Sequence, residues 1–175
     1  MTLDVSDPAN IRHKDTVYFV GDYVSSRMVD GSILLAYNYH VNTSKIDFSD
    51  PATFVPRYGR LENMQCIPAE NIVCPEDVTA TRYTVICKVN GDTLEVEGSA
   101  ALLSYSQELY VSADTVYATH GYTHKNSEVF NSKYKQTAMT EITGVSYAGE
   151  DKDFIGFNVY LQFQNSSGSW IRKPC

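Results

Sequence analysis

Strict alternation of residue character in two segments, residues 33–41 and 155–163, constrains the fold of this chain more than any other feature. In both segments the odd-numbered positions are apolar or aromatic. They are Ile33, Leu35, Tyr37, Tyr39 and Val41 in the first, and Ile155, Phe157, Val159, Leu161 and Phe163 in the second. Because successive side chains of a strand point to opposite faces, this period of two predicts half-buried antiparallel strands.

Residues 81–97 predict a β-hairpin. Asn90 and Gly91 separate two alternating runs, and this residue pair tolerates the positive φ angles of a two-residue type I′ turn. Such a turn places Val85 opposite Val96. The expected core face holds Tyr83, Val85, Cys87, Leu94 and Val96. The expected solvent face holds Thr84, Lys88, Glu95 and Glu97, with Ile86 as its apolar exception.

The rest of the chain predicts further short strands at residues 16–20, 101–111, 115–119 and 141–147, and one short helix at about 126–135. The long helical crossovers that parallel α/β folds need are missing from this pattern. The sequence therefore predicts an all-β fold. We expect a single antiparallel β-barrel or β-sandwich domain over residues 1–175, with at most one or two short helices.

The tetrapeptide Ser-Asp-Pro-Ala occurs twice, at residues 6–9 and 49–52. The residues around the two copies do not match. Asp-Pro commonly opens a turn or a single helical turn. We therefore interpret the repetition as shared turn chemistry rather than as duplication of a structural unit.

Charge and hydropathy exclude several classes of partner. The chain has 14 basic and 21 acidic residues, a formal net charge of −7, whereas nucleic-acid affinity depends on clustered Lys and Arg. No apolar run approaches the length that spans a bilayer. The first eight residues are polar and acidic, unlike a signal peptide. We expect neither nucleic acid nor membrane as a partner, and a cytoplasmic product as synthesised that can enter an assembled particle.

Cys66, Cys74, Cys87 and Cys175 form no Cys-x-x-Cys motif. We expect free thiols, because disulfides are rare in the reducing cytosol. The short step between Cys66 and Cys74 leaves a bridge between these two as the alternative.

His120 and His124 are four residues apart, a spacing that places two imidazoles on one face of a helix or a strand. A metal site needs a third ligand, such as His40 or an acid from elsewhere. The favoured interpretation is two exposed or hydrogen-bonded histidines at a strand end or loop, with no metal and no cofactor. The acidic residues 149–153 are interpreted as a solvated hairpin tip rather than a calcium loop.

The chain contains no Gly-x-Ser-x-Gly, P-loop or Gly-x-Gly-x-x-Gly motif. The first functional hypothesis is therefore a non-enzymatic structural or interaction subunit of a larger assembly, of a virion or tail type. Such a subunit binds copies of itself or a protein partner. Tyr160 and Trp170 are its candidate interface residues, because neither has a place in the core pattern.

The second hypothesis is a calycin-like β-barrel that binds a small apolar ligand, with isomerisation or cyclisation of that ligand as its activity. Its candidate binding residues are Tyr37, Tyr39, Asn38 and His40. Tyrosines with one polar tip often line concave pockets. The competing interpretation of the same residues is a tyrosine-rich core. Fold class alone does not decide between the two hypotheses.

Overall fold

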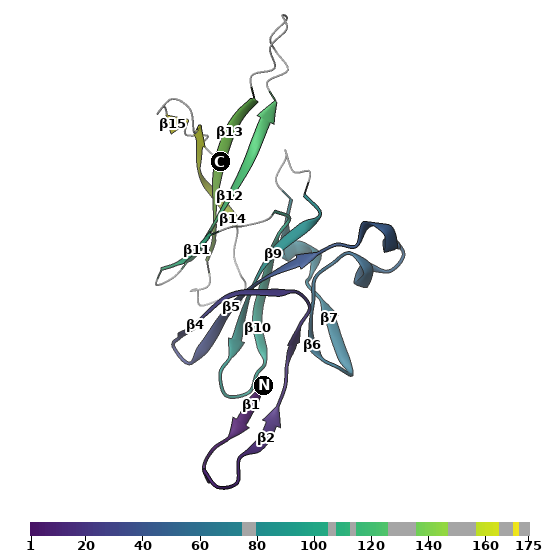
Figure 1. Cartoon of the computed structure of the whole chain (residues 1–175), viewed down its shortest axis with the longest axis vertical. Helices are drawn as coiled ribbons and strands as arrows, with labels where there is room; N and C mark the ends of the chain where they lie inside the picture. The colour runs from purple at the N-terminus through teal and green to yellow at the C-terminus, as the bar shows by residue number, and fades with distance from the viewer. Residues whose placement is uncertain are drawn as a thin grey trace, which may run out of the picture. The chain divides into compact units, whose positions relative to one another are not determined.

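The computed structural model describes residues 1–74, 80–104, 108–112, 115–125, 136–146, 157–164 and 170–171 (Figure 1). These residues form strands, and their helices are three short 3-10 turns, η1 (Thr43–Lys45), η2 (Pro51–Thr53) and η3 (Ala69–Asn71). The all-β class is therefore confirmed, although the described strands do not close into a barrel. The chain divides into two compact units, Met1–Tyr105 and Ser106–Cys175. Each unit is described by itself, so a single domain over 1–175 stays a prediction.

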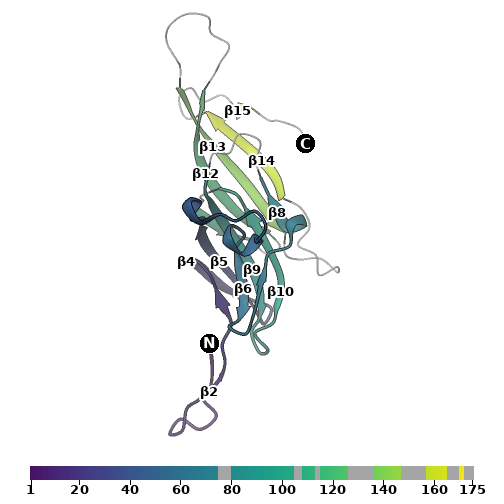
Figure 2. The ribbon, with the colours of Figure 1, turned by 90° about the vertical axis from the view of Figure 1, so that its right-hand side faces the viewer.

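The first unit is built around a five-stranded sheet (Figure 2). In sheet order its strands are β4 (Asp22–Val29), β5 (Ser32–His40), β9 (Arg82–Asn90), β10 (Val96–Leu102) and β8 (Ile72–Val73). Neighbouring strands are antiparallel, except that β8 runs parallel to β10. Within the described part of the chain, β4 and β8 are edge strands, whereas β5 and β9 have a neighbour on each side.

Two smaller sheets complete this unit. The chain begins with a hairpin of β1 (Thr2–Asp4) and β2 (Arg12–Asp15). A three-stranded sheet follows, formed by β3 (Tyr18–Phe19), β6 (Arg57–Arg60) and β7 (Asn63–Cys66). The strand predicted at residues 16–20 is therefore only the two-residue β3. Its Phe19 packs against the core together with Tyr58 of β6.

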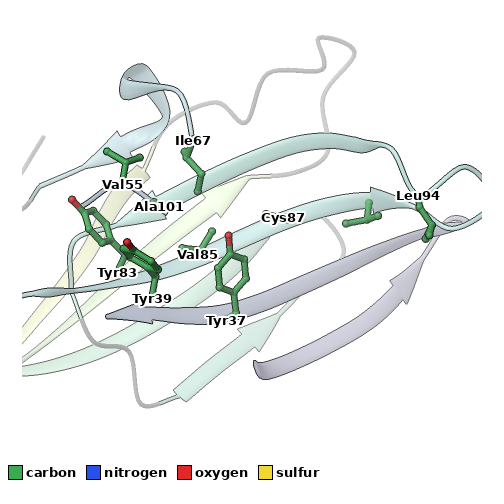
Figure 3. Close-up of a cluster of buried hydrophobic side chains, with 10 residues drawn as sticks. Tyr37, Tyr39, Val55, Ile67, Tyr83, Val85, Cys87, Leu94 and Ala101 are labelled. Carbon is green, nitrogen blue, oxygen red and sulfur yellow. The ribbon is translucent and has the colours of Figure 1, made fainter. Parts of the chain in front are cut away.

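The core of the first unit lies on the odd-numbered face of β5 and β9 (Figure 3). Its buried members on these two strands are Tyr37, Tyr39, Tyr83, Val85, Cys87 and Val89. Leu94, Ala101, Val55 and Ile67 are buried in the same cluster, and Ile33, Leu35, Val41 and Val96 pack against it partly buried. The alternation of residues 33–41 and the predicted core face of residues 81–97 are thus confirmed.

The even-numbered face of β5 and β9 is also largely buried, which corrects the predicted solvent face. Leu34 and Ala36 of β5 are buried, and so are Thr84 and Ile86 of β9. Thr84 is accommodated because its Oγ1 donates to Asn38 Oδ1 at 3.2 Å and to the Ser104 carbonyl at 3.0 Å. A hydrogen-bonded threonine can be buried at little cost, so its polarity did not indicate exposure.

The predicted hairpin is present, but its turn and register are not those expected. Val96 pairs with Val89, and Val85 pairs with Ala101, so the predicted pairing of Val85 with Val96 is wrong. Five residues, 91–95, separate β9 from β10. Asn90 Oδ1 accepts hydrogen bonds from the backbone N–H of the second and third residues after it, both at 3.0 Å. An asparagine that caps its own turn in this way favours a longer loop.

The two-residue turn with positive φ lies instead at Asp30 and Gly31, with φ angles of 48° and 81°, between β4 and β5. Asp-Gly is as favourable there as Asn-Gly. Gly91 does not adopt positive φ; its backbone N–H donates to the Gly31 carbonyl at 3.0 Å. A Cβ at position 91 would lie 2.5 Å from that oxygen. Gly91 is therefore required by the close approach of two turns.

The second unit is a five-stranded antiparallel sheet in chain order. Its strands are β11 (Glu108–Val111), β12 (Thr115–Lys125), β13 (Gln136–Ser146), β14 (Phe157–Gln164) and β15 (Trp170–Ile171). The strands predicted at 115–119, 141–147 and 155–163 are confirmed for residues 115–119, 141–146 and 157–163, and residues 147, 155 and 156 lie outside the described ones. The single strand predicted at 101–111 is wrong, because this stretch contains the end of β10 and the whole of β11.

Several other predictions concern local features. Both Ser-Asp-Pro-Ala copies form the expected turn, since Ala9 and Ala52 each donate their backbone N–H to the aspartate two residues earlier at 3.0 Å. Cys66, Cys74 and Cys87 are free, as expected. The helix predicted at 126–135, the acidic turn at 149–153 and Cys175 lie outside the described residues.

Candidate interaction surface

The four residues predicted to bind a ligand lie consecutively on β5, which separates their side chains. Tyr37 and Tyr39 are 2% and 8% exposed and belong to the core cluster (Figure 3). Asn38 is buried on the opposite face. His40 is exposed at the end of the strand, where its Nε2 lies 3.3 Å from Oδ2 of Asp22. The strand thus distributes the four over two faces and one end, and small-ligand binding by them stays a prediction.

The hydroxyl of Tyr37 is buried without a hydrogen-bond partner among the described residues. Burial raises the pKa of Tyr37 far above its usual range, and the neighbouring Cys87 thiol raises it further. Burial likewise raises the pKa of Cys87 to about 12. Both groups are therefore neutral at physiological pH, where an acid–base catalyst or a thiolate nucleophile would need to titrate. Tyr37 and Cys87 therefore contribute to the packing of the core.

Tyr39 and Tyr83 form an aromatic pair next to Val55 (Figure 3), with ring centroids 6.2 Å apart. Burial raises the pKa of both phenols, and the Arg57 guanidinium partly offsets this for Tyr39. Cys66 lies in the same region, and burial raises the pKa of its thiol as well. This cluster therefore holds no activated nucleophile and contributes aromatic packing energy.

The edge strand β4 carries exposed apolar side chains. Tyr23 is 68% exposed and Met28 is 66% exposed. The Tyr23 hydroxyl lies 3.1 Å from Ser26 Oγ, a contact that orients the ring along the strand. Asp22 and Arg27 of the same strand are also exposed. Since β5 is its only partner among the described strands, β4 combines an open backbone edge with accessible aromatic, apolar and charged groups.

The N-terminal hairpin β1–β2 is a second region of exposed apolar residues, and it extends beyond the five-stranded sheet (Figures 1 and 2). Leu3, Val5 and Ile11 are exposed on it. Its base is held by Asp15, whose Oδ2 accepts a hydrogen bond from Arg60 Nη2 at 2.6 Å. This hydrogen bond holds the pKa of Asp15 below its usual range. The hairpin is therefore anchored at one end and has an uncovered apolar surface.

Phe48 is a third exposed group, 88% exposed on the loop between β5 and β6. Hydrogen bonds within the loop fix its shape. Asp47 Oδ1 accepts from the backbone N–H of Ser49 at 2.9 Å and from its hydroxyl at 2.6 Å. The Asp47 backbone N–H donates to Thr53 Oγ1 at 3.0 Å. The ring of Phe48 lies 6.0 Å from that of Phe54. An aromatic side chain presented by a preformed loop loses little entropy when it binds.

The predicted interface residues Tyr160 and Trp170 lie on β14 and β15, and their side chains are outside the described ones. Trp170 pairs with Phe163, whereas Tyr160 falls at the register shift between β13 and β14 and has no direct partner on β13. His120 lies in the interior of β12, opposite Glu141, which corrects the strand end or loop expected there, and His124 lies near the end of the strand, opposite Thr137. Their side chains are also outside the described ones. The interface and histidine interpretations stay predictions.

Sequence reasoning missed β4, the N-terminal hairpin and Phe48. The residues of β4, of the N-terminal hairpin and of the loop around Phe48 do not alternate between apolar and polar. None of these three regions has one face buried in the core. One signal was present for β4. The pair Asp30 and Gly31 favours a type I′ hairpin, and such a turn predicts a strand on each side of it.

Comparison with known proteins gives a family for this fold. The family model described as the beta propeller domain matches residues 1–158. Searches of the curated proteins and of the solved structures found no match. The described sheets contain two, five, five and three strands, whereas propeller blades typically contain four. No helix in the described residues is long and apolar enough to cross a membrane. Propeller domains often mediate protein interactions, and with most of its length matched, the chain belongs to the beta propeller domain family.

Proposed function

We propose that this chain is a non-enzymatic interaction subunit that self-associates through its exposed strand edge. The observation that carries this proposal is the open edge of β4, on which Tyr23 and Met28 are both about two-thirds exposed. Aromatic residues and Met are enriched at protein interfaces. An unpaired strand edge offers backbone donors and acceptors to an added strand.

Two further regions support the same proposal. An isolated two-stranded hairpin is marginally stable in water, so the apolar side chains of β1–β2 gain stability when another surface covers them. Phe48 is an exposed aromatic group on a hydrogen-bonded loop, and exposed aromatic residues often anchor protein–protein contacts. The family match to a domain that often mediates interactions agrees with this role.

The larger context belongs to the proposal as well. We propose that the subunit joins an assembled particle of the virion or tail type, with Tyr160 and Trp170 as additional anchors. The alternative, a small apolar ligand bound by Tyr37, Tyr39, Asn38 and His40, requires these residues to open toward a ligand. Because Tyr37 and Tyr39 are almost fully buried, self-association is the better supported function.

Sedimentation velocity from low to high micromolar concentration tests the proposal. We expect the wild-type chain to form dimers or larger species as concentration rises. The double variant Tyr23→Ser/Met28→Ser should remain a monomer with unchanged β circular dichroism, because it loses apolar contact area but no core residue. Leu61→Ser is the matched control, since Leu61 is equally exposed on the turn between β6 and β7. A wild-type chain that is monomeric at every concentration would contradict self-association.

A further inference from the structure

The charged residues of β4 are arranged symmetrically along its open edge. The register between β4 and β5 shifts between Tyr23 and Ser25, so Val24 has no direct partner. As a result, Asp22 and Arg27 both lie opposite even-numbered residues of β5 and share one face of the sheet. Tyr23 and Ser26 lie opposite odd-numbered residues and share the other face. Asp22 and Arg27 are thus the two ends of the segment 22–27, and their side chains lie on the same face of the sheet.

We infer that two copies of the chain pair β4 with β4 antiparallel about a two-fold axis, with Asp22 of each copy opposite Arg27 of the other. This inference rests on the self-association proposed above. The register that places Asp22 opposite Arg27 also places Tyr23 opposite Ser26. Each pair joins residues of the same face, as a two-fold axis perpendicular to a sheet requires. The symmetry repeats both pairs, so one interface contains two opposite-charge pairs.

Other registers are less favourable. If the second copy slides by one residue, Tyr23 meets Arg27, which lies on the other face of β4. Such a slip exchanges the two faces of the added strand. If the second copy slides until Arg27 meets Arg27, two like charges lie directly opposite each other, which destabilises a strand pair. Of these three registers, only the one with Asp22 opposite Arg27 joins residues of the same face without placing like charges opposite each other.

The same charges distinguish this edge from one that is protected against pairing. A single type of charge protects an edge, because a second copy brings the same charge to the same place. β4 has one charge of each sign at positions that a two-fold axis superimposes, so a second copy brings the opposite charge. Asp22 also lies near His40 of its own chain, at 3.3 Å. Its carboxylate has a second oxygen for the guanidinium of the other copy.

A charge exchange between two variants tests the pairing. Asp22→Arg places Arg opposite Arg27 at both ends of the interface, and Arg27→Asp places Asp opposite Asp22. Each variant alone should associate at least about tenfold more weakly than the wild type, because like charges then face each other. An equal mixture of the two should associate, since every pair in the mixed dimer again has opposite charges. The double variant Asp22→Arg/Arg27→Asp should self-associate for the same reason.

Two controls match the charge changes. Glu62→Arg and Lys45→Asp alter the net charge by the same amounts at exposed positions outside β4, and both should associate like the wild type. Sedimentation velocity with one labelled partner reads out the mixture, and circular dichroism checks that each variant is folded.

The outcomes separate the two proposals. A wild type that never associates overturns self-association and, with it, this pairing. A wild type that associates while both single variants do so equally well overturns only the β4 pairing. Folded variants that associate neither alone, nor as a mixture, nor as the double variant overturn the register. Loss in each single variant with recovery in the mixture supports the pairing.

Discussion

Tyr23 of β4 and Tyr37 of β5 are direct cross-strand partners, yet Tyr37 is 2% exposed and Tyr23 is 68% exposed. The ring of Tyr37 packs against that of Phe19 from the three-stranded sheet, with centroids 5.7 Å apart. Tyr23 is near the edge, and its hydroxyl contacts Ser26 of its own strand. Backbone pairing is therefore not what buries a residue in this sheet. Burial depends on whether a second layer covers its position.

The same difference separates the two strands as wholes. β5 has a strand on each side and buried residues on both faces, so its residues contribute mainly to the stability of the unit. Among the described strands, β4 has β5 as its one neighbour, and most of its residues are exposed. It contributes less to the core and retains groups that can bind another chain. We therefore expect substitutions in β5 to change stability and substitutions in β4 to change association.

The largest expected effect is at this tyrosine pair. Tyr37→Ala should lower the free energy of unfolding by about 3–5 kcal/mol, because it leaves a large cavity in the core. Tyr23→Ala should change it by less than about 0.5 kcal/mol, as surface substitutions usually do. Urea denaturation at low micromolar concentration measures both. Tyr37→Phe is the control: it keeps the ring and removes only a hydroxyl that has no hydrogen-bond partner closer than its Cys87 neighbour among the described residues, so it should destabilise far less than Tyr37→Ala. Similar losses for Tyr37→Ala and Tyr23→Ala would invalidate the comparison.

A smaller effect is expected at two residues of β9 that share the even-numbered face. Thr84→Val should lower the free energy of unfolding by about 1–3 kcal/mol, because Asn38 Oδ1 and the Ser104 carbonyl lose a buried donor. Lys88→Ala should lower the free energy of unfolding by less than about 1 kcal/mol, since the Lys88 side chain is 35% exposed and its Nζ lies 3.8 Å from Glu97 Oε2. The same denaturation measurement compares them. If Lys88→Ala were the more destabilising change, this face would not be buried at Thr84 as described.

The sequence predicted β5 well and β4 not at all, and the reason is physical. The alternation of β5 identified its odd-numbered residues, which face the core cluster, although its even-numbered face is largely buried too. An edge strand with neither face fully covered need not alternate, and the residues of β4 have no period. Burial on the second face of β5 and β9 was also missed. A hydrogen-bonded Thr84 or a small Ala36 is compatible with either environment, so residue type alone did not decide.

The turns show a similar limit. Asn90-Gly91 and Asp30-Gly31 both favour a type I′ turn, and only the second adopts one. At the first, the side chain of Asn90 accepts hydrogen bonds from the backbone N–H groups of Asp92 and Thr93, and the loop is longer than a two-residue turn. The candidate interface could not be predicted for the same reason, because it depends on the three-dimensional arrangement of the strands. Tyr37 and Tyr23 are identical in chemistry, and only the three-dimensional arrangement shows that the first is core and the second is accessible.

The central claim is that β4 is an open edge that a second copy closes, and amide hydrogen exchange tests it most directly. Exchange is measured by mass spectrometry on peptides covering β4 and β5, at low and at high protein concentration. We predict that the β4 peptide exchanges more slowly at high concentration, because the added strand accepts its outward amides. The β5 peptide should not change, and in Arg27→Asp the β4 effect should disappear. Exchange of β4 that is independent of concentration would contradict the claim.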